Sequence, residues 1–198
     1  MAAELESLFH EMRRCRLCEQ ELSHGPNPII RGSEKSRLLI IGQAPGIRVH
    51  NTGIPFNDPS GDRLRQWLDI TRDVFYNEDN IAIMPMGLCY PGTGDRGDLP
   101  PPKRCAPQWH HRVLALMPNV KMTLLVRSYA QKYYLKPHYK TLTQALKQWQ
   151  ENPSNLIPLP HPSPRNNLWL KKNPWFEEDI LPLIRERLAA IPHSSSIN

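Results

Sequence analysis

Arg37-Leu-Leu-Ile-Ile-Gly-Gln-Ala-Pro-Gly46 is an apolar run that ends in a turn rich in glycine. The four aliphatic residues at 38–41 show no alternation of apolar and polar side chains, which is typical of a strand covered on both faces in a parallel sheet. Gly42 and Gly46 permit a tight turn and the close approach of a ligand to the backbone. The segment therefore predicts a buried strand followed either by a site-forming loop or by an ordinary strand-to-helix turn.

Further apolar segments of strand length alternate along the chain with segments of helical length. We expect strands at 81–85, 122–126 and 155–159, and helices at 3–21, 63–70, 107–116, 128–135, 142–149 and 175–190. This order predicts an α/β fold, a three-layer αβα sandwich with a four-stranded, mainly parallel sheet. We expect one domain over residues 1–198, with a frayed tail at 192–198, an irregular segment at 46–61 and a long loop at 86–102. Such folds bind ligands outside the carboxyl ends of the strands, where 42–46, 87–89 and 161–166 fall.

Composition limits the class of protein. At 198 residues and 39% hydrophobic, the chain can bury one sizeable core. Lys and Arg outnumber Asp and Glu by 25 to 19, a net charge of +6, which fits either a polyanionic partner or a merely basic surface. No run reaches the roughly 18 apolar residues of a membrane span, and the N-terminus lacks a basic region followed by an apolar one. We expect a cytoplasmic protein without membrane association, and a monomer.

Four cysteines occur in two pairs, Cys15-x2-Cys18 and Cys89-x15-Cys105. The first pair falls near the end of the amphipathic helix expected within residues 1–22, three positions apart and hence on one helix face. Sulfur ligands in fours suit zinc or an iron–sulfur cluster. The wide second gap is unlike that of zinc ribbons, and four free buried cysteines are the remaining alternative.

Two motifs and the order of the cysteines together carry a resemblance to a known family. With Gly42-Gln-Ala-Pro-Gly46 and His161-Pro-Ser-Pro-Arg-Asn166, the chain resembles the uracil-DNA glycosylase superfamily over most of residues 10–190. The first motif and the cysteines are most similar to the iron–sulfur-containing family-four branch, and the second motif to the single-strand-selective branch. The resemblance implies a 4Fe-4S cluster on Cys15, Cys18, Cys89 and Cys105, with zinc as the alternative. It also implies a DNA substrate containing uracil or a related deaminated base, cleaved by water without a catalytic metal during base excision repair.

The resemblance also assigns residues to the site. Phe56 matches the aromatic residue that stacks on the extruded base, and His161 matches the histidine that donates a hydrogen bond to the base oxygen. Without the family, Phe56 would be read as a core aromatic and His161 as a structural histidine. The base pocket is expected to consist of Gly42, Ala44, Pro45, Gly46, Phe56 and Met86.

The sequence departs from the family at the residues that hold the water and read the base. Ala44 stands where many members carry Asp or Asn, and Gln43 stands where family-four members commonly have Glu. Asp58 is the nearest carboxylate, and it is either the catalytic base or a helix N-cap. Pro85 or Met86 replaces the Asn that reads uracil, so the preferred base stays open. The expected catalytic residues are His161, Asp58 and Gln43.

The expected contacts with DNA lie near the strand ends. Ser163 could hold a phosphate, and Arg165 and Asn166 lie where the family inserts a wedge into the duplex. The full expected set is Ser60, Ser163, Arg165, Asn166, Lys171 and Lys172. The rival hypothesis is a cluster-bearing nucleic-acid-binding module without catalysis. A phosphate-handling hydrolase is disfavoured because the chain has neither a P-loop nor a nucleophile elbow.

Overall fold

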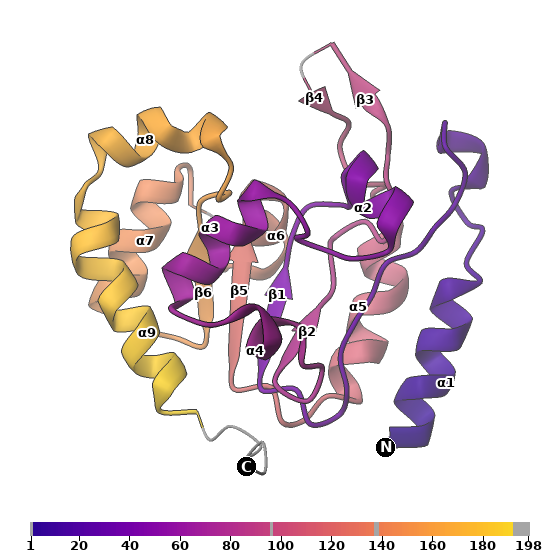
Figure 1. Cartoon of the computed structure of the whole chain (residues 1–198), viewed down its shortest axis with the longest axis horizontal. Coiled ribbons are helices and arrows are strands. Elements are labelled where there is room, and N and C mark those ends of the chain that lie inside the picture. Colours follow the sequence, from indigo (N-terminus) through magenta and orange to yellow (C-terminus); the bar gives the residue numbers. More distant parts are fainter. Residues whose placement is uncertain (1, 96, 137–138, 192–198) are drawn as a thin grey trace.

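The computed structural model describes residues 2–95, 97–136 and 139–191. Four strands, β1 (Leu38–Ile41), β2 (Ile81–Ile83), β5 (Met122–Val126) and β6 (Leu156–Leu159), form one sheet in the order β2-β1-β5-β6. Each neighbouring pair is parallel, which confirms the predicted α/β sheet (Figure 1). The expected frayed tail at 192–198 lies outside the described residues.

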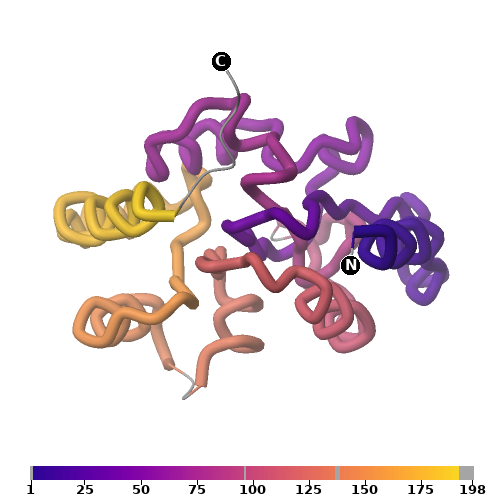
Figure 2. Tube along the Cα trace, turned by 90° about the horizontal axis from the view of Figure 1, so that it is seen from below, coloured from indigo at the N-terminus to yellow at the C-terminus, as the bar shows by residue number. Residues whose placement is uncertain are grey.

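Helices cover both faces of this sheet (Figures 1 and 2). They are α1 (Ala2–Arg13), α2 (Ile47–Thr52), α3 (Pro59–Leu68), α4 (Arg72–Tyr76), α5 (Cys105–Ala115), α6 (Ser128–Tyr134), α7 (Leu142–Glu151), α8 (Asn167–Lys172) and α9 (Leu181–Ala189). Short 3-10 turns occupy η1 (Glu19–Glu21) and η2 (Pro164–Asn166), and a π-helical turn, η3 (Phe176–Ile180), leads into α9. Within the described residues, none of these helices is both long and apolar enough to cross a bilayer.

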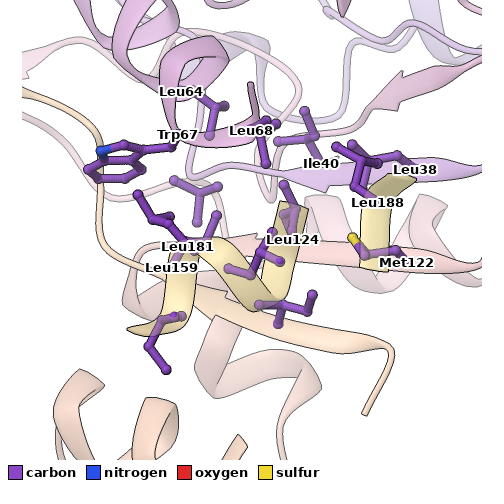
Figure 3. Close-up of a cluster of buried hydrophobic side chains, with 14 of the residues drawn as sticks. Leu38, Ile40, Leu64, Trp67, Leu68, Met122, Leu124, Leu159, Leu181 and Leu188 are labelled. Carbon is purple, nitrogen blue, oxygen red and sulfur yellow. The ribbon is translucent and has the colours of Figure 1, made fainter. Parts of the chain in front are cut away.

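The side chains of β1 alternate between two hydrophobic clusters, which explains its uninterrupted apolar run. Leu38 and Ile40 join the cluster formed with α3, α4, α7 and α9, whereas Leu39 and Ile41 join the cluster formed with α1, α5 and α6. Figure 3 shows part of the first cluster, where side chains of α3 such as Leu64 gather with residues of the sheet. Burying each such side chain contributes about 1.5–3 kcal/mol.

The strand order places the candidate binding crevice. The chain passes from β1 to β2 on one side, whereas β5 and β6 lie on the other side of β1. Connections leaving β1 and β5 therefore diverge, and ligands in open α/β sheets bind at such a switch point, outside the carboxyl ends of the strands.

Four local predictions were wrong. Helix α1 ends at Arg13 because its buried face ends at Met12, and beyond it Leu17 is 50% exposed with no core to cover. Cys15 and Cys18 therefore lie in the turns after the helix and not on one helix face. The segment at 46–61 contains α2, which Gly53 terminates in a left-handed conformation. The loop at 86–102 contains a small antiparallel hairpin of β3 (Thr93–Gly94) and β4 (Gly97–Asp98).

Candidate functional site

A cavity of about 360 Å³ opens at the carboxyl ends of the strands. Its walls come from the loop after β1, the start of α3, strand β4, the end of β5 and the segment after β6. Most of the predicted site residues line it, namely Gly42, Gln43, Ala44, Pro45, Gly46, Phe56, Asp58, Ser60, His161, Ser163, Arg165 and Asn166. The structure thus brings together two motifs separated by more than a hundred residues of sequence.

Phe56 is held in a fixed position on the cavity wall. Its φ is +55°, a left-handed conformation that is uncommon for an aromatic residue. Arg65, which is only 7% exposed, donates a hydrogen bond from Nη1 to the Phe56 carbonyl oxygen at 3.4 Å. The Phe56 ring meets the edge of Phe75 with centroids 6.0 Å apart, and its Cζ passes 3.7 Å from the position that a Cβ on Gly42 would occupy. These contacts leave the ring as a preformed apolar platform.

Asp58 is the N-cap of α3, as one of its two interpretations predicted. Its Oδ1 accepts a hydrogen bond from the Gly61 N–H at 2.9 Å, and Pro59 occupies the first turn. Asp58 also lines the cavity. The cap uses one carboxylate oxygen, and no residue that the structure describes donates a hydrogen bond to the other. The catalytic role stays a prediction.

Gln43 lies at the base of the cavity and is 7% exposed. Its side-chain Nε2 donates to the Leu99 carbonyl oxygen at 3.3 Å, and its main-chain carbonyl oxygen accepts from the Gly87 N–H at 2.9 Å. Its buried Oε1 has no hydrogen-bond partner among the described residues. The loop after β1 is thereby tied to the segments after β2 and β4.

His161 lines the same cavity as Phe56, at the exit of β6. The pKa of His161 is lowered to about 4, mainly by burial and also by the positive charges of Arg127 and Arg165, against the opposing effect of the Asp58 and Asp98 carboxylates. At neutral pH the imidazole is therefore uncharged and carries one N–H donor.

The segment after His161 is braced internally. The Asn166 Nδ2 donates to the His161 carbonyl oxygen at 2.7 Å, and Arg63 Nη1 donates to the Ser163 carbonyl oxygen at 3.3 Å. The Asn166 side chain is thus tied to the backbone of its own segment, and its role toward DNA stays a prediction. Leu168, in α8 just beyond it, is 73% exposed. Lys171 and Lys172 lie exposed at the end of α8, away from the cavity lining.

Met86 does not line the cavity, contrary to the prediction. Its side chain is buried in the second hydrophobic cluster, and Pro85 takes the place at the cavity wall. The Pro85 carbonyl oxygen accepts a hydrogen bond from His110 Nε2 at 3.1 Å, and Tyr134 donates its hydroxyl to His110 Nδ1 at 2.6 Å. Successive residues of an extended chain point to opposite sides, so only one of this pair could face the cavity.

Two charged residues at the cavity were missed by the sequence analysis. Asp98 reaches it from β4, and its Oδ2 lies 3.9 Å from the position that a Cβ on Gly46 would occupy. Arg127 reaches it from the end of β5. A charged residue directly after an apolar strand was a usable signal for Arg127, whereas nothing local marks Asp98, which the hairpin brings into place.

The four cysteines lie near one another, with Cys105 buried and the other three half-buried. The pKa of Cys89 is raised to about 11 and that of Cys105 to about 12, mainly by burial and in part by the neighbouring thiols. The Leu88 N–H donates to Cys105 Sγ at 3.3 Å. Within the described part of the chain, no group of three or more His, Cys, Asp or Glu residues is arranged to hold a metal ion. The donor set, four thiols, still has the chemistry that zinc and iron–sulfur clusters require.

The comparison with protein families agrees with the geometry. Residues 29–185 match the family model described as the uracil DNA glycosylase superfamily. The match includes both cavity motifs and the second cysteine pair, and it begins after Cys18. Since it spans well over half of the 198 residues, this chain belongs to the uracil DNA glycosylase superfamily.

Proposed function

We propose that the protein is a monofunctional DNA glycosylase that hydrolyses the N-glycosidic bond of uracil or a related deaminated base in base excision repair. The observation that carries this proposal is the presence in one cavity of a fixed aromatic platform, Phe56, and an uncharged histidine donor, His161. An enzyme acting on a base must take it out of the stack and hold it in such a pocket.

The charges expected in the reaction match the groups around the cavity. Breaking a glycosidic bond places positive charge on the sugar and negative charge on the departing base. A neutral His161 can donate its N–H to a base oxygen, while the free oxygen of Asp58 can hold a water and accept its proton. Removing one such hydrogen-bond donor typically lowers a rate by about 10²–10³-fold.

The residues that line the cavity do not single out one preferred base. Pro85 offers no side-chain donor or acceptor to the edge of a base, and the Gln43 Nε2 is already bonded to Leu99. We therefore propose a substrate range of deaminated bases and not uracil alone. In this scheme Leu168 supplies an apolar side chain that can occupy the space left in the duplex, with Arg165 and Ser163 near the backbone.

We further propose that Cys15, Cys18, Cys89 and Cys105 hold a 4Fe-4S cluster. The support is the donor set and the electrostatic influence of the four thiols on one another. When bound, the cluster would tie the N-terminal segment to the two ends of the loop at 86–102. Its contribution would be to stability, because none of the four residues lines the cavity.

The direct test is release of free base from oligonucleotides that contain uracil, hypoxanthine or xanthine, in single- and double-stranded form. Wild-type protein should release at least one of these bases and leave an abasic site. His161→Ala should lower the single-turnover rate by about 10²–10³-fold, whereas His111→Ala, at an exposed position on α5, should match wild type. Binding of DNA without release of any base would instead support the non-catalytic nucleic-acid-binding module.

A further inference from the structure

Arg127 has a backbone conformation that is normally found at glycine residues. Its φ is +75° and its ψ is 166°, a region in which an L side chain is strained. Of the residues that the structure describes, only Phe56, Asp69 and Arg127 combine a positive φ with a side chain. Asp69 ends α3 in the ordinary left-handed region, which aspartate tolerates. The other two line the cavity.

The fold explains the conformation of Arg127 but not the choice of arginine. The Arg127 N–H donates to the Leu159 carbonyl oxygen at 3.0 Å, which extends the pairing of β5 with β6. Its carbonyl oxygen accepts from the Gln131 N–H at 3.3 Å, in the first turn of α6. A single residue thus joins strand to helix, and glycine would make this junction without strain. The arginine at this position is therefore explained by something other than the fold.

The side chain of Arg127 is exposed at the cavity wall. Among residues 2–95, 97–136 and 139–191, none accepts a hydrogen bond from its guanidinium or forms an ion pair with it. The side chain lines the cavity at the end of β5, across the switch point from the loop after β1. It is also close enough to His161 for its charge to disfavour the imidazolium. A positive charge therefore stands beside the hydrogen-bond donor.

We propose that the Arg127 guanidinium contacts the departing base and stabilises the negative charge that develops on it. This inference rests on the proposed glycosylase function. As the C1′–N bond breaks, its electron pair stays on the base, while the water oxygen bonds to C1′ and a water proton passes to the Asp58 carboxylate. Arg127 transfers no proton in this step. A positive charge at the wall of a cavity that the base fills stabilises such an anion more than the same charge in bulk water.

The experiment compares Arg127→Gly and Arg127→Met in the full chain. Arg127→Gly removes the charge and the strain together, so its melting temperature should rise by several degrees while its single-turnover excision rate falls by about 10²-fold or more. Arg127→Met keeps the strain and removes the charge, so its rate should fall equally without the gain in stability. In both variants the acid limb of the rate profile should move to higher pH, because the charge that lowers the pKa of His161 is lost while Asp58 and Asp98 still raise it and Arg165 still lowers it.

The matched control is Asp69→Gly, which relieves a positive φ at the end of α3, outside the cavity lining. Its melting temperature should not fall and its excision rate should equal that of wild type. Wild-type rates in both Arg127 variants would overturn the inference and leave the glycosylase function standing. A weaker Kd for DNA with an unchanged single-turnover rate would make Arg127 a phosphate contact and also overturn it. A wild-type protein that releases no base would overturn the function and the inference together.

Discussion

The carbonyl oxygen of Phe56 lies only 1.7 Å from the position that a Cβ on Gly61 would occupy. Gly61 is the residue whose N–H is capped by Asp58 at the start of α3. The helix start and the aromatic platform of the cavity are therefore built as one unit, and a change in either one is transmitted to the other.

Gly61→Ala should displace the Phe56 backbone, because neither the capped helix turn nor the carbonyl can yield without losing a hydrogen bond. We expect a loss of about 1–3 kcal/mol in the free energy of unfolding, as for other overpacked sites, and weaker excision. Gly42→Ala is the stability control, since its Cβ would meet Phe56 at an ordinary 3.7 Å. Denaturant titration of both variants measures the difference, and equal stability of the two would contradict the coupling.

Asp58→Asn and Asp58→Ala separate the cap from catalysis. Asn also caps helices, so Asp58→Asn should keep the stability of wild type but lose about 10²–10⁴-fold in single-turnover rate if Asp58 accepts the proton of the water. Asp58→Ala should lose the rate and also about 0.5–2 kcal/mol of stability. A fully active Asp58→Asn enzyme would show that the attacking water is held by Gln43, Asp98 or the loop backbone instead.

The acid limb of excision should reflect the lowered pKa of His161. Since burial brings that pKa to about 4, the neutral donor persists well below the usual histidine range. The single-turnover rate should therefore stay level as pH falls through about 6.5 and decline only near the lower value. A decline centred on the ordinary histidine pKa would show that His161 is more solvated during the reaction than the cavity indicates.

Stability should respond to acid through His110, which is 1% exposed. Burial lowers its pKa to about 4, so between that value and about 6.5 the unfolded chain binds a proton that the folded chain does not. The His110 contribution to the free energy of unfolding is therefore complete above the unfolded pKa and is lost as pH falls toward the folded pKa. At about 1.4 kcal/mol per unit of pKa shift, the total loss is roughly 3 kcal/mol. Urea titrations at several pH values measure this slope, and His110→Gln should reduce it by one proton. An unchanged slope in that variant would place the proton uptake elsewhere.

The metal prediction is tested by composition. Protein purified anaerobically should be brown and contain iron and sulfide, and Cys89→Ala should lose the colour together with solubility, since the N-terminal segment and the loop at 86–102 are released together. A colourless preparation with stoichiometric zinc would contradict the iron–sulfur prediction and show that the four cysteines bind zinc. Ser7→Ala, on the exposed face of α1, is a control that should retain the metal.

Local patterns in the sequence were sufficient for the sheet and for most of the cavity. Uninterrupted apolar runs such as 38–41 and 122–126 identify strands buried on both faces, because each strand needs apolar residues toward both helical layers. The parallel order then brings the loop after β1 and the segment after β6 to one edge. The glycines of the first motif could therefore be placed at this edge without coordinates, whereas the roles of Phe56 and His161 came from the resemblance to the family.

Tertiary structure decided the features that depend on packing and register. Helix α1 stops at Arg13 because the core that it covers ends there, and helical periodicity alone does not show where that partner surface ends. Pro85 and not Met86 faces the cavity because neighbouring residues of an extended segment point to opposite sides, so an error of one position reverses the assignment. The strained junction at Arg127 and the approach of Asp98 arise only when strand β6 and the hairpin close around the cavity, since both depend on contacts between residues far apart in the chain.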